Sequence, residues 1–237
     1  MNHLPNRFLT PRWRATLDTA AAVAMLLASL AIIKTRLSLP GSTSGGPALP
    51  RAPVSLDGAA IKGQRSARVG ILQFSDFHCS FCARFAREVL PAIEEAYIKK
   101  GAALIAFRHL PLVRIHPQAM RAAESAECAR RQGAFWEAHD RLFDDTSHFD
   151  GSLMFQRFEG LRIDRVQFEA CMSGQATAAI KTDIAEAGRV GIRITPTFLL
   201  GTIEENGRLR VERVITGARQ FNEFQAAIDG IIARQRH

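Results

Sequence analysis

The sequence has no run of basic residues beyond residue 36, and it contains only 2 tryptophans and 1 tyrosine. Half of the formal net charge of +8 falls before residue 37, and the other +4 is spread over residues 37–237. A nucleic-acid-binding domain gathers lysines and arginines on one face, often with aromatic side chains among them. These absences argue against such a surface, and we expect no nucleic-acid partner.

The 4 cysteines and 7 histidines also lack the paired spacings of a metal site. Cys79 and Cys82 form one pair, but a zinc site needs a second pair close by, whereas Cys128 and Cys171 follow Cys82 by 46 and 89 residues. We therefore expect no metal. The Cys79 and Cys82 pair is then either redox-active or an inert structural disulfide.

The uncharged apolar stretch 19–33 is short for a membrane span, and it becomes 15–33 if Asp18 lies at the membrane interface. The preceding flank, 1–14, is basic and has no acidic residue. This pattern predicts a transmembrane anchor at 15–33. Two alternatives stay open: a signal sequence cleaved near Ser29 and Ala31, or a buried helix of a soluble protein.

Residues 34–53 contain a cluster of proline, glycine and serine and are predicted to be a linker, with the folded domain at 54–237. An anchor or a signal would both export this domain. We expect a single-pass protein of the cell membrane with its domain on the periplasmic side, or a periplasmic protein after cleavage. Outside the cytoplasm, thiols are driven towards disulfides.

The hydrophobic pattern of the domain predicts strand, helix, strand, then a helical block, then two strands and a closing helix. A buried strand at 68–74 leads into a helix from 81 to 97, in which Pro91 predicts a kink, and a parallel strand follows. The full set of predicted elements is strands at 54–56, 59–62, 68–74, 102–107, 197–200 and 209–215, helical segments between 117 and 189, and a helix at 221–234.

The pair Cys79 and Cys82 stands where the buried strand meets the helix. The first turn of a helix has unpaired N–H groups and the positive end of the helix dipole, and both favour a thiolate over a thiol. We therefore predict a Cys79 pKa between roughly 3.5 and 7. His78 is adjacent and would stabilise the thiolate if protonated, or it is simply a solvent-facing histidine of the loop.

Several ordered motifs resemble the DsbA-like thioredoxin-fold family. They are the segment from Gly70 to Phe85 with its Cys-Ser-Phe-Cys motif, Phe107–Leu112, Ala126–Ala129 with Gly133–His139, and Gly191–Phe198. The resemblance begins near residue 53 and runs to the end of the chain. It implies an α/β thioredoxin fold, βαβ followed by ββα, with an inserted helical subdomain at about 116–189.

The resemblance also implies roles for individual residues. Cys79 would be the exposed attacking thiolate, and Cys82 the partly buried cysteine that resolves mixed disulfides. Pro196 would follow a cis bond opposite the cysteine pair, with the Thr195 backbone pairing with a substrate peptide. The alternative for Pro196 is a trans proline that begins a strand.

Gln73 departs from the family pattern, because the position six before Cys79 is commonly acidic there and helps to move the proton of the resolving cysteine. Glutamine takes up no proton. We therefore expect slow deprotonation of Cys82 and long-lived mixed disulfides, unless Asp76 or a water substitutes.

Cys128 and Cys171 lie in the predicted helical insertion. We expect a structural disulfide between them, since the domain is predicted to be exported, and the alternative is two buried free thiols.

The function indicated is an extracytoplasmic thiol–disulfide oxidoreductase that acts on cysteine-containing exported proteins and uses no cofactor beyond its own cysteines. Its partners would include a membrane redox protein that re-oxidises or reduces Cys79 and Cys82. Two alternatives stay open: a holdase that binds unfolded chains, and a dedicated reductase fed by a membrane electron donor.

Overall fold

The computed structural model describes residues 49–146, 149 and 154–235. The predicted flank at 1–14, the predicted anchor or signal at 15–33 and most of the predicted linker lie outside these residues. Within the described residues, no helix is both long and apolar enough to cross a membrane.

A six-stranded sheet forms the centre of the domain, in the order β1-β6-β5-β3-β4-β2. The strands β3 and β4 are parallel, as predicted, and the other neighbouring pairs are antiparallel. All seven residues of β3 are buried, because this strand lies between β4 and β5 and is covered on both faces. The strands are β1 (Val54–Ser55), β2 (Ala60–Lys62), β3 (Val69–Ser75), β4 (Ala103–His109), β5 (Thr197–Ile203) and β6 (Arg208–Thr216).

The helices follow the predicted order. The helix after β3 alternates between α-helical and π-helical segments along its length. Pro91 lies at the start of the second α-helical segment, where its missing N–H leaves a backbone carbonyl without its usual donor. The segments are α2 (Ser80–Arg84), η1 (Phe85–Val89), α3 (Leu90–Ile93), η2 (Glu94–Ile98), α4 (Ala119–Arg130), α5 (Phe135–Asp144), η3 (Gln156–Phe158), α6 (Arg165–Met172), α7 (Thr177–Arg189) and α8 (Phe221–Arg234).

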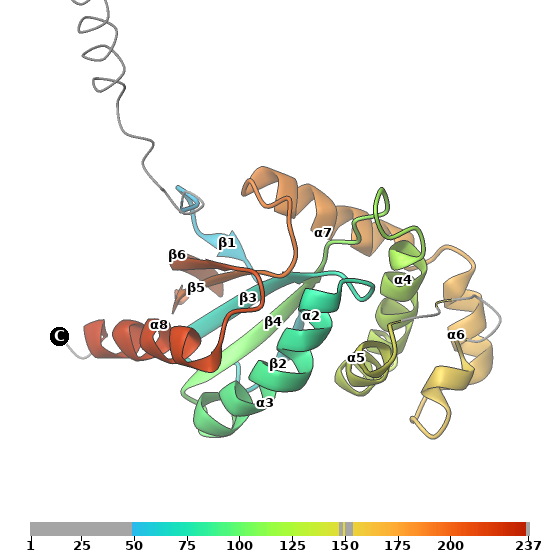
Figure 1. Cartoon of the computed structure of the whole chain (residues 1–237), viewed down its shortest axis with the longest axis horizontal. Coiled ribbons are helices and arrows are strands. Elements are labelled where there is room, and N and C mark those ends of the chain that lie inside the picture. Colours follow the sequence, from blue (N-terminus) through green and yellow to red (C-terminus); the bar gives the residue numbers. More distant parts are fainter. Residues whose placement is uncertain (1–48, 147–148, 150–153, 236–237) are drawn as a thin grey trace, which may run out of the picture. The chain divides into compact units, whose positions relative to one another are not determined.

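Helices cover both faces of the sheet (Figure 1). On one face, Ile71 of β3 packs with Phe85 and with Phe224 of α8. On the other face, Leu72 packs with Ala187 of α7. Successive residues of a strand point to opposite faces, so the continuous apolar run of β3 supplies both cores.

The helices between β4 and β5 form the helical subdomain implied by the resemblance. Its core includes a disulfide between Cys128 of α4 and Cys171 of α6, with an S–S distance of 1.99 Å. The same cluster of buried side chains extends to Phe77, Cys79 and Cys82. The insertion therefore packs directly against the segment that carries the cysteine pair.

Candidate active site

The loop between β3 and α2 places Cys79 at the N-cap of α2, with an extended backbone (φ −83°, ψ 119°). The Cys79 N–H donates to the carbonyl oxygen of Asp76 at 3.1 Å, and the Ala83 N–H donates to the carbonyl oxygen of Cys79 at 3.0 Å. The first hydrogen bond turns the chain out of the strand, and the second begins the helix. The Cys79 side chain therefore lies at the helix N-terminus.

The pKa of the Cys79 thiol is lowered to about 5. The largest cause is a hydrogen bond with the Cys82 thiol, and the side chain of Thr195 and the backbone N–H groups of Cys82 and Phe81 lower the pKa further. Burial acts in the opposite direction. All of these donors stabilise the negative sulfur more than the neutral thiol. The pKa lies within the predicted range, and Cys79 is a thiolate at neutral pH.

Cys82 differs from Cys79 although it is only three residues away. Its side chain is fully buried, and this burial raises its pKa well above the ordinary value for a cysteine. The hydrogen bond and the charge of Cys79 raise the pKa further, whereas the Ser75 side chain lowers it. The two cysteines are free thiols in this structure, with Cys79 ionised first.

Two expectations about exposure need correction. Cys79 is only 6% exposed, not an exposed residue, and Cys82 is completely rather than partly buried. The cause lies 116 residues further along the chain, where the carbonyl oxygen of Thr195 approaches the Cys79 Sγ to 3.6 Å. The loop before β5 thus packs against the sulfur and contributes to the burial of Cys79.

The Thr195–Pro196 bond in this loop is cis, as the resemblance implied. Pro196 is buried, and its carbonyl oxygen accepts a hydrogen bond from the Gly217 N–H at 2.8 Å. The neighbouring Ile194 side chain is 56% exposed. The structure therefore places a partly exposed peptide segment, 194–195, next to the thiolate.

Asp76 organises the other side of the site and is not free to replace a missing acid. Its buried carboxylate accepts from the His78 N–H and the Leu112 N–H, both at 2.8 Å, and lies 2.8 Å from Nδ1 of His116. Asp76 therefore holds the loop that carries Cys79 in position. His116 is a site residue that the sequence analysis missed, because it lies 40 residues from Asp76 and no local pattern signals the contact.

His78 packs against other rings of the site. Its ring stacks on the His116 ring, with 5.3 Å between the centroids, and meets the edge of Phe149 at 5.4 Å. Its Nδ1 is buried and has no hydrogen-bond partner among the described residues. His78 is not among the causes of the Cys79 pKa shift, so packing of its ring is the role that the geometry shows.

Gln73 is fully buried on β3, between Phe107 of β4 and Phe198 of β5. Two residues further along and on the same face of the sheet, Ser75 interacts with Cys82. Neither polar atom of the Gln73 side chain has a hydrogen-bond partner within the described part of the chain. Gln73 therefore shares a face of β3 with Ser75, which acts on the pKa of Cys82, and its own polar group is unused among the described residues.

The fold and the site together define a class, the thioredoxin-fold proteins of DsbA-like architecture. A family model described as thioredoxin matches residues 56–230. Among solved structures, α-DsbA1 of Wolbachia pipientis superposes with a TM-score of 0.65 at 23% identity over 76% of this chain and 94% of that one. BdbD of Bacillus subtilis superposes with a TM-score of 0.67 at 18% identity, over 78% and 98%.

The curated relatives are longer proteins. Na+/H+ antiporter NhaA 3 of Salinispora tropica is 31% identical over 195 residues, which are 82% of this chain and 29% of the antiporter. The chain thus spans less than a third of that relative. Since the thioredoxin match covers most of the chain, the protein belongs to the thioredoxin family, with the DsbA-like fold.

Proposed function

We propose that this protein is an extracytoplasmic thiol–disulfide oxidoreductase that exchanges disulfides with exported proteins through Cys79 and Cys82. One observation carries the proposal: a Cys79 sulfur with a pKa of about 5 at a helix N-terminus, facing the cis-proline loop, with a buried second thiol in hydrogen-bond contact. This arrangement supplies both an ionised sulfur and a group that displaces it.

In the oxidised protein, a substrate thiolate attacks Sγ of Cys79, the bond between Cys79 and Cys82 breaks, and Cys82 leaves as a thiolate that takes up a proton. A second substrate thiolate then attacks the substrate sulfur of the mixed disulfide, and Cys79 leaves as a thiolate. Two electrons pass from the substrate to the cysteine pair, and the substrate gains one disulfide. A membrane redox partner would accept these electrons.

The pKa of Cys79 favours the oxidising direction. A thiolate held at a pKa of about 5 is more stable than an ordinary thiol at neutral pH, so the reduced form is favoured and the disulfide is a good oxidant. We therefore expect a potential closer to about −120 mV than to about −270 mV. A potential close to about −270 mV would instead favour the dedicated reductase.

Exposed apolar side chains around the site fit unfolded substrates. Phe81 lies between the two cysteines and is 54% exposed, Ile194 precedes the cis-proline segment, and Ile115 next to His116 is 68% exposed. Apolar surface of this kind contacts the side chains that an unfolded chain has not yet buried. The proposed substrates are therefore exported proteins before or during folding.

The proposed location rests on the N-terminal sequence, with an anchor at 15–33 and the domain on the periplasmic side, or a cleaved signal. Protease protection and N-terminal sequencing of the full chain in cells would test the anchor against the cleaved signal.

The activity is tested with the full chain, oxidised and then mixed with a reduced peptide that contains two cysteines. We expect rapid peptide oxidation by the wild type and none by Cys79→Ser. Cys82→Ser is mixed instead with the same peptide in its disulfide form: its Cys79 thiolate attacks the peptide disulfide, the other peptide sulfur leaves as a thiolate, and the mixed disulfide on Cys79 is trapped. A holdase gives the contrary result, since Cys79→Ser would still suppress aggregation of an unfolded protein as well as the wild type does. Equilibration with a glutathione series then gives the potential.

A further inference from the structure

The strand β6 has an unpaired outer edge over most of its length. β1 pairs with it only at Arg208 and Leu209, and from Arg210 to Thr216 no described residue pairs with that edge. Thr216 lies opposite Thr197, and the N–H of Gly217, the residue after β6, donates to the Pro196 carbonyl oxygen. Because bonding directions alternate along a strand, the backbone groups of Arg213 and Ile215 also point towards β5. The N–H and C=O groups of Val214 and Thr216 therefore point outward.

These outward groups are available to another strand. Arg219 Nε donates to the carbonyl oxygen of Thr216 at 3.0 Å. The N–H and C=O of Val214 and the N–H of Thr216 have no partner among the described residues. A row of free backbone groups on an edge strand is a template for an added strand.

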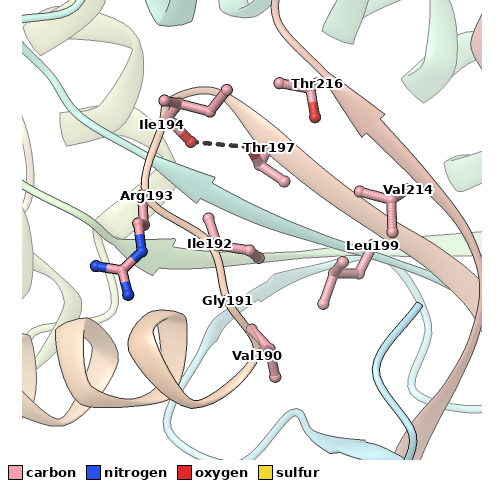
Figure 2. Close-up of a pocket in the computed structure, with 9 residues that line it drawn as sticks. All are labelled: Val190, Gly191, Ile192, Arg193, Ile194, Thr197, Leu199, Val214 and Thr216. Carbon is pink, nitrogen blue, oxygen red and sulfur yellow. Dashed lines mark hydrogen bonds between the residues drawn. The ribbon is translucent and has the colours of Figure 1, made fainter. Parts of the chain in front are cut away.

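An apolar cavity of about 450 Å³ adjoins this edge on one face of the sheet. Figure 2 shows the Val190–Ile194 segment on one side of the cavity and Val214 and Thr216 on the other. The buried side chains of Ile192 and Leu199 also line it. A strand added to β6 would place alternate side chains beside Val214, within reach of this cavity.

The opposite face and the edge itself are basic. A second cavity of about 390 Å³ is lined by Arg213 and Arg219, with Glu223 as its acidic residue. Arg208 and Arg210 are exposed further along β6, whereas Glu212 already accepts from Arg234. A second copy of this chain would bring the same arginines together at the edge, which is unfavourable. Charge complementarity favours an acidic partner.

We propose that the outer edge of β6 binds an extended segment of a substrate polypeptide, in which apolar residues alternate with acidic ones. The segment adds a strand beside Val214 and Thr216, with apolar side chains towards the 450 Å³ cavity and acidic side chains towards Arg213. This inference rests on the proposed function, since it names the kind of substrate that the oxidoreductase prefers.

The edge is close enough to the cysteines to act in substrate selection. β6 neighbours β5, which begins directly after Pro196, and adjacent strands are about 4.8 Å apart. An added strand would thus lie about 10 Å from β5, a distance that about three extended residues span. A substrate held at the edge can present a cysteine a few residues away to Cys79.

The test is a binding titration of the full chain with a short, labelled, cysteine-free peptide of alternating glutamate and valine. We expect saturable binding, at least about tenfold tighter than for a peptide of alternating lysine and valine. Val214→Pro removes one outward N–H without touching the bonds to β5, and we expect about fivefold to tenfold weaker binding. Arg213→Glu should weaken binding about tenfold and reverse the charge preference.

Arg162→Glu is the matched control, since it makes the same charge change at an exposed arginine of the helical subdomain. Wild-type affinity in folded Val214→Pro, or equal losses in Arg162→Glu and Arg213→Glu, would overturn the proposal. Oxidation of a small dithiol peptide without the alternation is measured in parallel. Exchange without binding of the glutamate–valine peptide overturns this inference alone, whereas binding without exchange overturns the proposed function.

Discussion

The Cys79 Sγ lies 3.6 Å from the carbonyl oxygen of Thr195, a residue 116 positions further along the chain. This contact joins the helix N-terminus, which stabilises the thiolate, to the cis-proline loop, which covers it. The contact helps to bury Cys79, which is only 6% exposed, whereas its pKa of about 5 comes from the Cys82 thiol, the Thr195 side chain and the N–H groups of Cys82 and Phe81. Reactivity at this site is therefore controlled by the loop as well as by the helix.

The reaction of Cys79 with an alkylating agent should already be at half of its maximal rate near pH 5, and it should change little between pH 7 and 8. An ordinary thiol would speed up almost tenfold over each pH unit below its pKa. Thiolate absorbance followed against pH provides the measurement. An inflection near 8.5 in the folded protein would contradict the proposed mechanism.

The Cys82 thiol is the largest cause of that shift, so Cys82→Ala should raise the pKa of Cys79, whereas Cys82→Ser keeps a hydrogen-bond donor and should raise it less. The same absorbance titration compares the two variants. A Cys79 pKa that is the same in Cys82→Ala as in the wild type would show that the Cys82 thiol is not the main cause of the shift.

Gln73→Glu should speed the resolution of mixed disulfides. It puts a carboxylate on the same face of β3 as Ser75, which acts on Cys82, and the raised pKa of Cys82 makes its deprotonation slow. A positioned base contributes about a hundredfold or more when proton transfer limits the rate. Quenched-flow measurement of mixed-disulfide decay gives the rate, with Gln73→Leu as the control without a base. An unchanged rate in Gln73→Glu would rule out this role.

Removal of the disulfide should destabilise the helical insertion. Cys128 and Cys171 are separated by 43 residues, and the chain-entropy account gives a loss of about 4 kcal/mol for a loop of that length. The double variant Cys128→Ala, Cys171→Ala is compared with the wild type by urea unfolding under non-reducing conditions. A loss below about 1 kcal/mol would show that packing of α4 against α6 carries the stability.

Asp183→Ala should be among the most damaging single changes. Asp183 of α7 forms a buried ion pair with Arg108 of β4 and accepts the His109 N–H at 2.9 Å. Its removal leaves the buried guanidinium without its charge partner, which costs about 3–5 kcal/mol. Thermal unfolding measures the loss, and Glu186→Ala, whose partner Arg189 is half exposed, serves as the mild control.

Stability should fall as the pH is lowered below about 6.5. Burial lowers the pKa of His109 and His139 in the folded protein, so the unfolded chain takes up protons first. Each histidine can remove at most about 2 kcal/mol at pH 5, and this contribution is absent above the unfolded pKa. Urea unfolding at pH 7.5 and pH 5 gives the difference. His139→Phe should reduce it, and an unchanged difference would exclude His139.

The element order was predictable because β3, the cysteine helix and α8 have strong local patterns. Both ends of the helix at 221–234 were predicted correctly, and the ends of the strands at 69–75 and 103–109 were predicted to within one or two residues. The cis bond before Pro196 was implied by the resemblance to the family, since an isolated X–Pro bond favours trans. The π-helical segments around Pro91 were missed, because they depend on how one turn adapts to the missing N–H.

The contacts within the site could not be predicted from the sequence. The pairing of His116 with Asp76, the ring packing of His78 and the buried pair of Arg108 with Asp183 all join residues from different elements. No periodicity or spacing signals such contacts, because each depends on which faces of two elements meet. The coverage of Cys79 by the Thr195 loop was missed for the same reason.

The residues alone predicted two cysteines three apart at the start of a helix, after a strand apolar enough to be buried on both faces. These are local properties, since helix termini and strand burial follow from neighbouring residues. The burial of Cys79, the pairing of Asp76 with His116 and the β6 edge that no described residue pairs beyond Leu209 became visible only in the folded domain. Those features depend on long-range packing, where residues distant along the chain set the dielectric and the hydrogen-bond partners of each site.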